Sequence, residues 1–231
     1  MKALRIGTAA ALAAGLLALA PAAGAALVGI YRNGMAGKGQ LAQIVKLSGT
    51  RCGRGGTGTA LAITIGKETR ECSYRTPVVG RDLEIAATER LLGKTPKPVQ
   101  QGAYLALDLR AGSGSGYQLA VYPKQRKAQV RKVLDGGEVE YLHIAKNVAA
   151  IEGVERDNDL RLRAFNVTEG EEKGSCRILA YVGGELVADV TDPGAGELAG
   201  RASGFSLGSA KAAKGAQATV DDVVVRVPSP F

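Results

Sequence analysis

Apolar and polar residues alternate with a period of two along most of this chain, and glycine-rich turns interrupt the alternation at short intervals. A period of two places successive side chains on opposite faces of a strand, whereas a helix repeats every 3.6 residues. Leu105, Leu107 and Leu109 share one such face, and the Gly/Ser segment 111–116 ends that strand. The pattern predicts an all-β domain of short antiparallel strands.

Two segments carry strong hairpin signals. Asp-Gly-Gly at 135–137 closes a basic strand at 126–134, and Gly-Gly at 183–184 joins strands at 178–182 and 186–190. The other predicted strands cover residues 60–65, 82–87, 117–121, 160–165 and 220–227. The predicted helix content is one short turn at 88–92. Short, evenly spaced strands with few helix signals favour two packed antiparallel sheets.

The first 25 residues have the order of a secretory signal peptide. Lys2 and Arg5 precede an apolar stretch at 6–19, and small residues lead to a predicted cleavage site before Ala26. The apolar stretch is short for a membrane span. We therefore expect a secreted, extracytoplasmic protein that is not inserted in the membrane after cleavage; a retained anchor is the alternative.

The remaining chain divides into an N-terminal segment, 26–50, with a predicted edge strand at 41–47, and a β-sandwich domain, 51–231. Cleavage removes two basic residues and no acidic one, so the formal net charge falls from +8 to +6. The basic residues are spread along the chain, which does not favour nucleic-acid binding. A basic surface is compatible with acidic polymers and equally with a role in solubility. The oligomeric state is not predicted.

The chain has three cysteines, and export implies a compartment in which disulfides persist. Cys52 and Cys72 flank a predicted strand, so we expect them to form a disulfide. Cys176 is in phase with Ile178 and Ala180, which predicts a buried, unreactive thiol.

Several segments occur in an order that resembles a known superfamily. A strand ending in Arg110 precedes a Gly/Ser turn and the aromatic-led strand 116–121, and the strand pair 179–192, the segment 200–205 and a closing strand at 220–225 follow. From about residue 103 to 227 the chain resembles the concanavalin A-like lectin and glucanase superfamily, in its laminin-G-like and keto-disaccharide-hydrolase-like branch. The resemblance implies a two-sheet antiparallel jelly-roll sandwich whose more concave sheet carries the ligand.

The resemblance does not supply catalytic residues. The glucanases of this superfamily place carboxylates as Glu-x-x-Asp-x-x-Glu on one strand, because nucleophile and acid must face the same side. The nearest pairs here are Asp82 with Glu84 and Glu138 with Glu140, and each lacks the third carboxylate. His143 is the single histidine, and its alternation with Tyr141 indicates an ordinary surface residue. We therefore predict no catalytic residues and no zinc site.

Two acidic clusters make a structural calcium ion the one cofactor that the sequence does not exclude. Residues 157–159 are Asp-Asn-Asp, and Asp221 and Asp222 are adjacent in the last strand. Oxygen ligands suit Ca²⁺, but Asp and Asn also favour turns for reasons of their own.

The leading hypothesis is a non-catalytic, lectin-like module that binds a polysaccharide or an anionic cell-wall polymer. The candidate ligand-binding residues are those predicted to point outward from the strands: Arg110, Tyr122, Arg131, Arg161 and Arg163. Arginine can clamp a carboxylate or phosphate with paired hydrogen bonds. The absence of tryptophan weighs against a neutral-sugar platform. A glycoside hydrolase and a purely structural or adhesive module are the alternatives.

Overall fold

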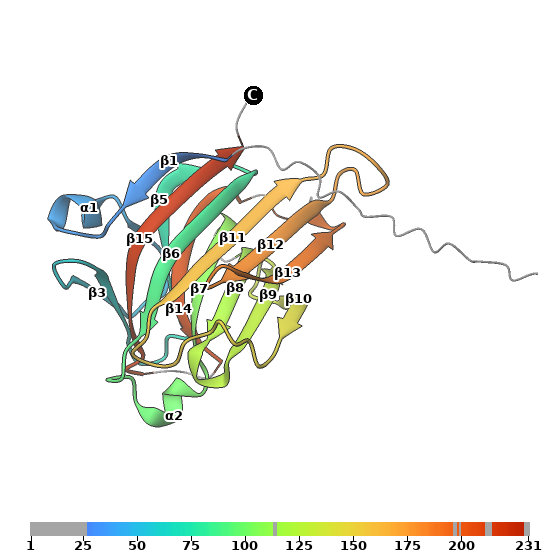
Figure 1. The fold of residues 1–231 in the computed structure, drawn as a ribbon. Helices are drawn as coiled ribbons and strands as arrows, with labels where there is room; N and C mark the ends of the chain where they lie inside the picture. The colour runs from blue at the N-terminus through green and yellow to red at the C-terminus, as the bar shows by residue number, and fades with distance from the viewer. Residues whose placement is uncertain (1–26, 113–114, 196–197, 199, 211–213, 229–231) are drawn as a thin grey trace, which may run out of the picture.

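Two antiparallel sheets pack face to face in the computed structural model, which describes residues 27–112, 115–195, 198, 200–210 and 214–228 (Figure 1). Sheet A has the spatial order β13 (Glu185–Asp192), β12 (Cys176–Val182), β11 (Asn158–Asn166), β6 (Leu83–Leu91), β15 (Gln217–Pro228), β4 (Leu61–Ile65) and β3 (Cys52–Gly56), and β1 (Leu27–Asn33) also pairs with β15. Sheet B has the order β10 (Val139–Ala145), β9 (Lys127–Val133), β8 (Gly116–Tyr122), β7 (Ala103–Ala111), β14 (Ala202–Ser209), β5 (Glu71–Val79) and β2 (Val45–Ser48). The predicted all-β, two-sheet sandwich is confirmed.

The core lies between the sheets and follows the predicted alternation. Leu105, Leu107 and Leu109 of β7 are fully buried, as are Leu162 of β11 and Ile178 of β12. Burying a side chain of this size contributes about 1.5–3 kcal/mol. Both predicted hairpins form, between β9 and β10 and between β12 and β13. Gly183 and Gly184 have φ of 57° and 84°, the left-handed conformation that a tight hairpin turn requires.

The helix predicted at 88–92 is wrong, because β6 continues to Leu91. Thr88 and Arg90 face outward while Glu89 and Leu91 are buried, which is a period of two. This part of β6 pairs with β11 on one side and β15 on the other. Hydrogen bonding on both sides outweighs the weak helical propensity of the segment.

The N-terminal segment contributes to both sheets. β1 was not predicted and pairs with β15, which is far away in sequence. The edge strand predicted at 41–47 is shifted: helix α1 covers Lys38–Ala42, and β2 begins at Val45 on the edge of sheet B. The predicted signal peptide and its cleavage site lie outside the described residues. The two α-helices in the described part, α1 and α2 (Lys97–Gln100), are each too short to span a membrane.

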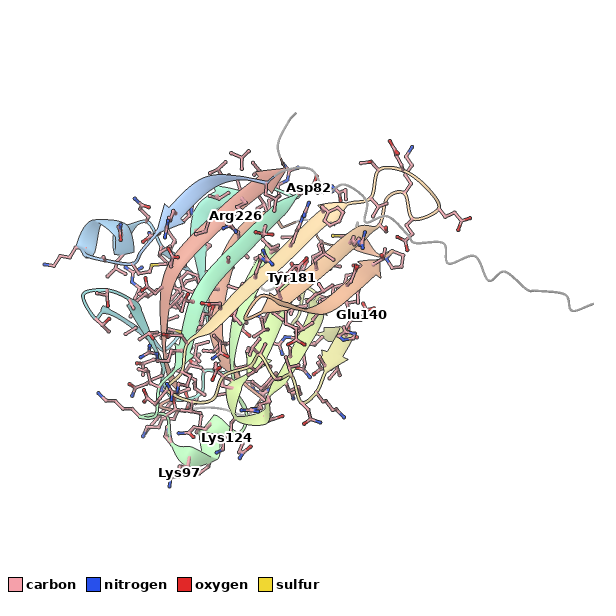
Figure 2. All side chains as sticks on the ribbon, in the orientation of Figure 1. Asp82, Lys97, Lys124, Glu140, Tyr181 and Arg226 are labelled. Atoms are coloured by element: carbon pink, nitrogen blue, oxygen red, sulfur yellow. A yellow bond between two sulfur atoms is a disulfide. The ribbon has the colours of Figure 1, made fainter. Side chains whose placement is uncertain are left out.

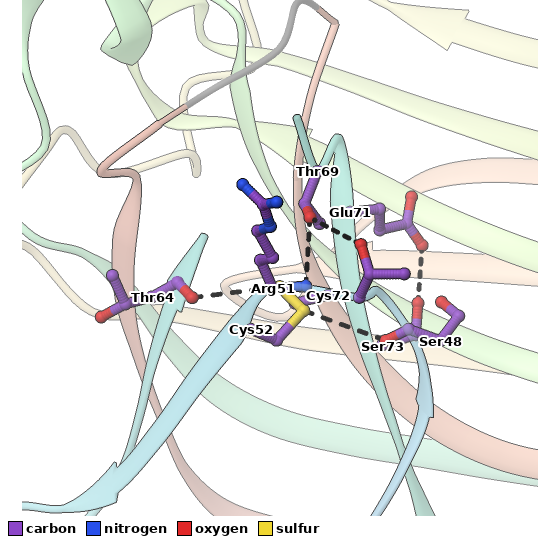
Figure 3. Close-up of a disulfide and its surroundings, with 9 residues drawn as sticks. Ser48, Arg51, Cys52, Thr64, Thr69, Glu71, Cys72 and Ser73 are labelled. Carbon is purple, nitrogen blue, oxygen red and sulfur yellow. Dashed lines mark hydrogen bonds between the residues drawn. A yellow bond between two sulfur atoms is a disulfide. The ribbon is translucent and has the colours of Figure 1, made fainter. Parts of the chain in front are cut away.

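The predicted disulfide forms between Cys52 and Cys72 (Figure 3). Cys52 lies on β3 of sheet A and Cys72 on β5 of sheet B, so the bridge ties the two sheets together beside the N-terminal segment. Cys176 is a free, fully buried cysteine on β12, as its phase predicts.

Candidate binding groove on sheet B

The outer face of sheet B, which points away from the core, carries a groove of about 460 Å³. Its lining runs from Ser48 on β2 to Tyr141 on β10, at opposite edges of the sheet. β14 lies at the middle of the groove between β7 and β5, although these strands are widely separated in sequence. Side chains of β5, β7, β8 and β9 form the floor.

Gln118 of β8 connects the polar groups of the floor. Its amide nitrogen donates to Asp108 Oδ1 at 2.6 Å, to Ser206 Oγ at 3.0 Å and to Glu71 Oε1 at 3.2 Å. Its side-chain oxygen accepts a hydrogen bond of 2.6 Å from Arg131 Nε. One amide thus links residues of β5, β7, β9 and β14, and the network holds the floor in one arrangement.

Arg131 of β9 is committed to this network. Its guanidinium lies 3.7 Å from Glu71 Oε2 and 4.4 Å above the ring of Tyr104. Tyr104 also donates a hydrogen bond to Glu71. Arg131 is buried, and the carboxylate of Glu71 balances its charge within the floor. The pair therefore offers little net positive charge to a ligand.

Aromatic rings cover one side of the groove. Tyr104 and Tyr122 pack with their ring centroids 5.3 Å apart, and Lys127 Nζ lies 3.9 Å from the Tyr122 centroid. Both rings are largely covered, whereas Tyr141 on the edge strand β10 is 55% exposed. Gly208 of β14 makes room for Tyr104, because a Cβ at this position would overlap the Tyr104 ring. The groove therefore combines one exposed ring with a polar floor.

Asp108 is the least satisfied group of the floor. Burial, and then the negative charge of Glu71, raise the pKa of Asp108 to about 7. Its Oδ2 is buried and has no hydrogen-bond partner in the structure. Gln129, on the same face of β9, has a buried Oε1 that also lacks a partner. A buried acceptor without a donor costs about 1–3 kcal/mol, so both atoms lower the stability of this face of the sheet.

The structure brings together two of the five candidate ligand-binding residues, Tyr122 and Arg131. Arg110 is 1% exposed and does not point outward. Its φ of 52° departs from the strand conformation, and its guanidinium lies over the Tyr117 ring and donates to Asn166 Oδ1 at 2.9 Å. Arg161 and Arg163 lie on the outer face of sheet A, on the opposite side of the sandwich.

The carboxylate pairs singled out in the sequence do not form a catalytic site. Asp82 accepts a hydrogen bond of 2.8 Å from the backbone of Asn166, whereas Glu84 pairs with Arg226 at 2.7 Å on the outer face of sheet A. Glu138 and Glu140 are exposed at the hairpin of β9 and β10, and Figure 2 places Glu140 at this edge.

The acidic clusters have protein partners. Asp157 pairs with Arg90 at 2.7 Å, and Asp222 pairs with Arg32 at 2.9 Å. Asn158 caps the loop by accepting from the backbone of Glu152. Within the described ranges, no three His, Cys, Asp or Glu side chains gather as a metal site.

Sequence patterns missed the residues that build the floor. Tyr104 and Asp108 alternate with the buried leucines of β7, and Gln118 alternates with Tyr117 and Leu119 on β8. That phase identifies them as outward residues. It does not show that they meet Glu71, because the intervening strand β14 comes from a segment about 90 residues later in the chain.

Comparison with known proteins identifies the fold. The CBM66 carbohydrate-binding module of Bacillus subtilis is 16% identical, with a TM-score of 0.56, over 78% of this chain and 93% of that one. The β-glucanase of Bacillus licheniformis is 9% identical, with a TM-score of 0.58, over 86% of this chain and 98% of that one. This chain has the concanavalin A-like jelly-roll fold.

A third structure with this jelly roll is the carbohydrate recognition domain of Emp46p, 13% identical with a TM-score of 0.53, over 81% of this chain and 89% of that one. No family model and no curated protein matches the sequence. At these identities the likeness shows the jelly roll alone, and function has to be argued from the groove.

Proposed function

We propose that this chain is an exported, lectin-like module whose groove on sheet B binds a polysaccharide without cleaving it. The observation that carries the proposal is the groove itself, which extends between both edges of sheet B and combines an exposed tyrosine ring with a polar floor. Two of the structures with the same fold are, by name, carbohydrate-binding domains.

The groove matches the chemistry of a sugar chain. A sugar ring has apolar faces and hydroxyl edges, so it is recognised by an aromatic face beside hydrogen-bonding groups. Tyr141 offers the exposed ring at the edge of the groove. Glu71, whose side chain is 30% exposed, and Ser73 line the groove beside it as hydrogen-bonding groups.

The groove favours recognition through hydroxyl groups over an arginine clamp on an anionic ligand. Arg131 is bonded to Gln118 and balanced by Glu71. Arg110 is turned into the sandwich. Lys127 remains at the groove face beside Tyr122, and burial and then the charge of Arg131 lower its pKa.

Titration with a panel of neutral and acidic polysaccharides tests the proposal. Wild-type protein should bind a member of the panel, and Tyr141→Ala should weaken that binding by about 2- to 13-fold, the equivalent of a 0.5–1.5 kcal/mol ring contact. Tyr31→Ala is the matched control, since Tyr31 lies on β1 of sheet A, outside the groove. Equal losses in both variants, or no binding to any polysaccharide, would contradict the proposal and favour the purely structural module.

A glycoside hydrolase is the second candidate, and one observation favours it. Glu71 and Asp108 both bond to Gln118 Nε2, so the bonded oxygens are at most about 6 Å apart, a limit that allows the roughly 5–5.5 Å of a retaining pair. Against it, both carboxyl groups are engaged by Gln118, and the free oxygen of Asp108 is buried. Release of reducing ends from the same panel, abolished by Asp108→Asn, would establish this candidate in place of the first.

Export is tested separately from binding. If the predicted signal peptide is cleaved, intact-mass measurement of the exported protein should give a chain that begins at Ala26. A mass that includes residues 1–25 would refute the cleavage.

A further inference from the structure

The outer face of sheet A carries a second feature that the groove does not use. Arg161 and Arg163 are alternate residues of β11, so both side chains point outward from sheet A. Their backbone positions are about 7 Å apart, the spacing of alternate residues on a strand. Both arginines lie away from the edges of the sheet, because β6 and β12 flank β11.

Each of these arginines is held by an aromatic ring. The Arg161 guanidinium lies 4.0 Å from the ring centroid of Tyr181, its cross-strand neighbour on β12. The Arg163 guanidinium lies 4.9 Å from the ring centroid of Phe165. Stacking restricts the side chain before a ligand arrives and leaves N–H groups at the guanidinium edge available to an anion. Arg161 Nε is buried with no hydrogen-bond partner.

The other arginines of this face are neutralised within the chain. Arg90 pairs with Asp157 at 2.7 Å, Arg177 pairs with Asp189 at 2.6 Å, and Arg226 pairs with Glu84 at 2.7 Å. Figure 2 shows Tyr181 and Arg226 on this face of the sandwich. Arg161 and Arg163 form no ion pair with a described residue, even though Glu84 is the cross-strand neighbour of Arg163.

We propose that the Arg161–Arg163 pair, stacked on Tyr181 and Phe165, is a second binding site that takes the carboxylates of an anionic polysaccharide. The guanidinium edge matches a carboxylate with two parallel hydrogen bonds. A single exposed ion pair is worth only about 0.2–1 kcal/mol, so a polymer that engages both arginines is favoured over a small anion. The site is independent of the groove, which lies on the other sheet.

Polygalacturonate at low and raised salt is the probe. The double variant Arg161→Ala/Arg163→Ala should bind it about 10-fold more weakly than wild type, and the slope of log affinity against log salt should fall by about two. The matched control is Arg90→Ala/Arg177→Ala, which removes the same charge from the same face and should change the affinity much less, because both of these arginines are already paired.

Three outcomes would overturn the site. Equal losses in the two double variants would show general electrostatic attraction and no specific pair. Absence of wild-type binding at low salt would remove the site altogether. Loss of polygalacturonate binding in Tyr141→Ala but not in Arg161→Ala/Arg163→Ala would place the polymer in the groove, which separates failure of this proposal from failure of the groove proposal.

Discussion

Removal of the Cys52–Cys72 disulfide should lower the free energy of unfolding by about 3 kcal/mol. The two cysteines are 20 residues apart, and the loss of chain entropy on closing a loop of this length corresponds to roughly 3 kcal/mol at 25 °C. For a chain of this size, that loss corresponds to a fall in the melting temperature of about 6–12 °C.

Urea denaturation of the Cys52→Ala/Cys72→Ala variant and of wild type, each with and without reductant, measures this difference. Wild-type protein should lose stability on reduction, while the variant should be insensitive to the reductant. Cys176→Ala controls for the loss of a buried sulfur, and it should keep the sensitivity to reductant. A difference below about 1 kcal/mol between oxidised and reduced wild type would refute the entropic argument.

Three further outcomes follow from buried groups. Glu89 is buried, neither of its oxygens has a hydrogen-bond partner, and burial and then Asp108 raise its pKa well above 4.5. The folded state therefore holds a proton on Glu89 more tightly than the unfolded state does. The stability that this gives is complete below about pH 4.5 and is lost as pH rises through the raised pKa. Urea unfolding between about pH 5 and pH 7 should show a steeper loss in wild type than in Glu89→Gln, by up to about 1.4 kcal/mol per pH unit, and parallel profiles would contradict this. Gly208→Ala should cost about 1–3 kcal/mol in unfolding free energy because its Cβ meets the Tyr104 ring, whereas the unobstructed Gly153→Ala should change stability by no more than about 1 kcal/mol. Burial raises the pKa of Cys176 to about 11, so thiol alkylation should occur at this cysteine only after denaturation, and rapid labelling of native protein would show that it is accessible.

Local sequence patterns predicted the elements of the fold far better than their partners. Alternation placed the leucines of β7 and the thiol of Cys176 in the core, and glycine pairs located both hairpins. The pairing of β1 with β15 connects the two ends of the described chain, and no local pattern encodes it. The segment at 88–92 became strand because β11 and β15 hold it on both sides.

The candidate site shows the same limit. Outward phase identified Tyr122 and Arg131, but phase does not say to which sheet a strand belongs, so Arg161 and Arg163 were grouped with residues of the opposite sheet. Arg110 was misplaced because its φ of 52° breaks the alternation at the end of β7. The Gln118 network depends on the insertion of β14 between β5 and β7, which is a property of the tertiary fold.

Hydrogen-exchange mass spectrometry of the protein with and without its tightest-binding neutral polysaccharide tests the groove most directly. Binding in the groove should protect amides of β8, β9 and β10, within residues 116–145, and leave β11 and β12 of sheet A unchanged. Protection confined to sheet A, or none in the groove strands at saturating ligand, would contradict the account.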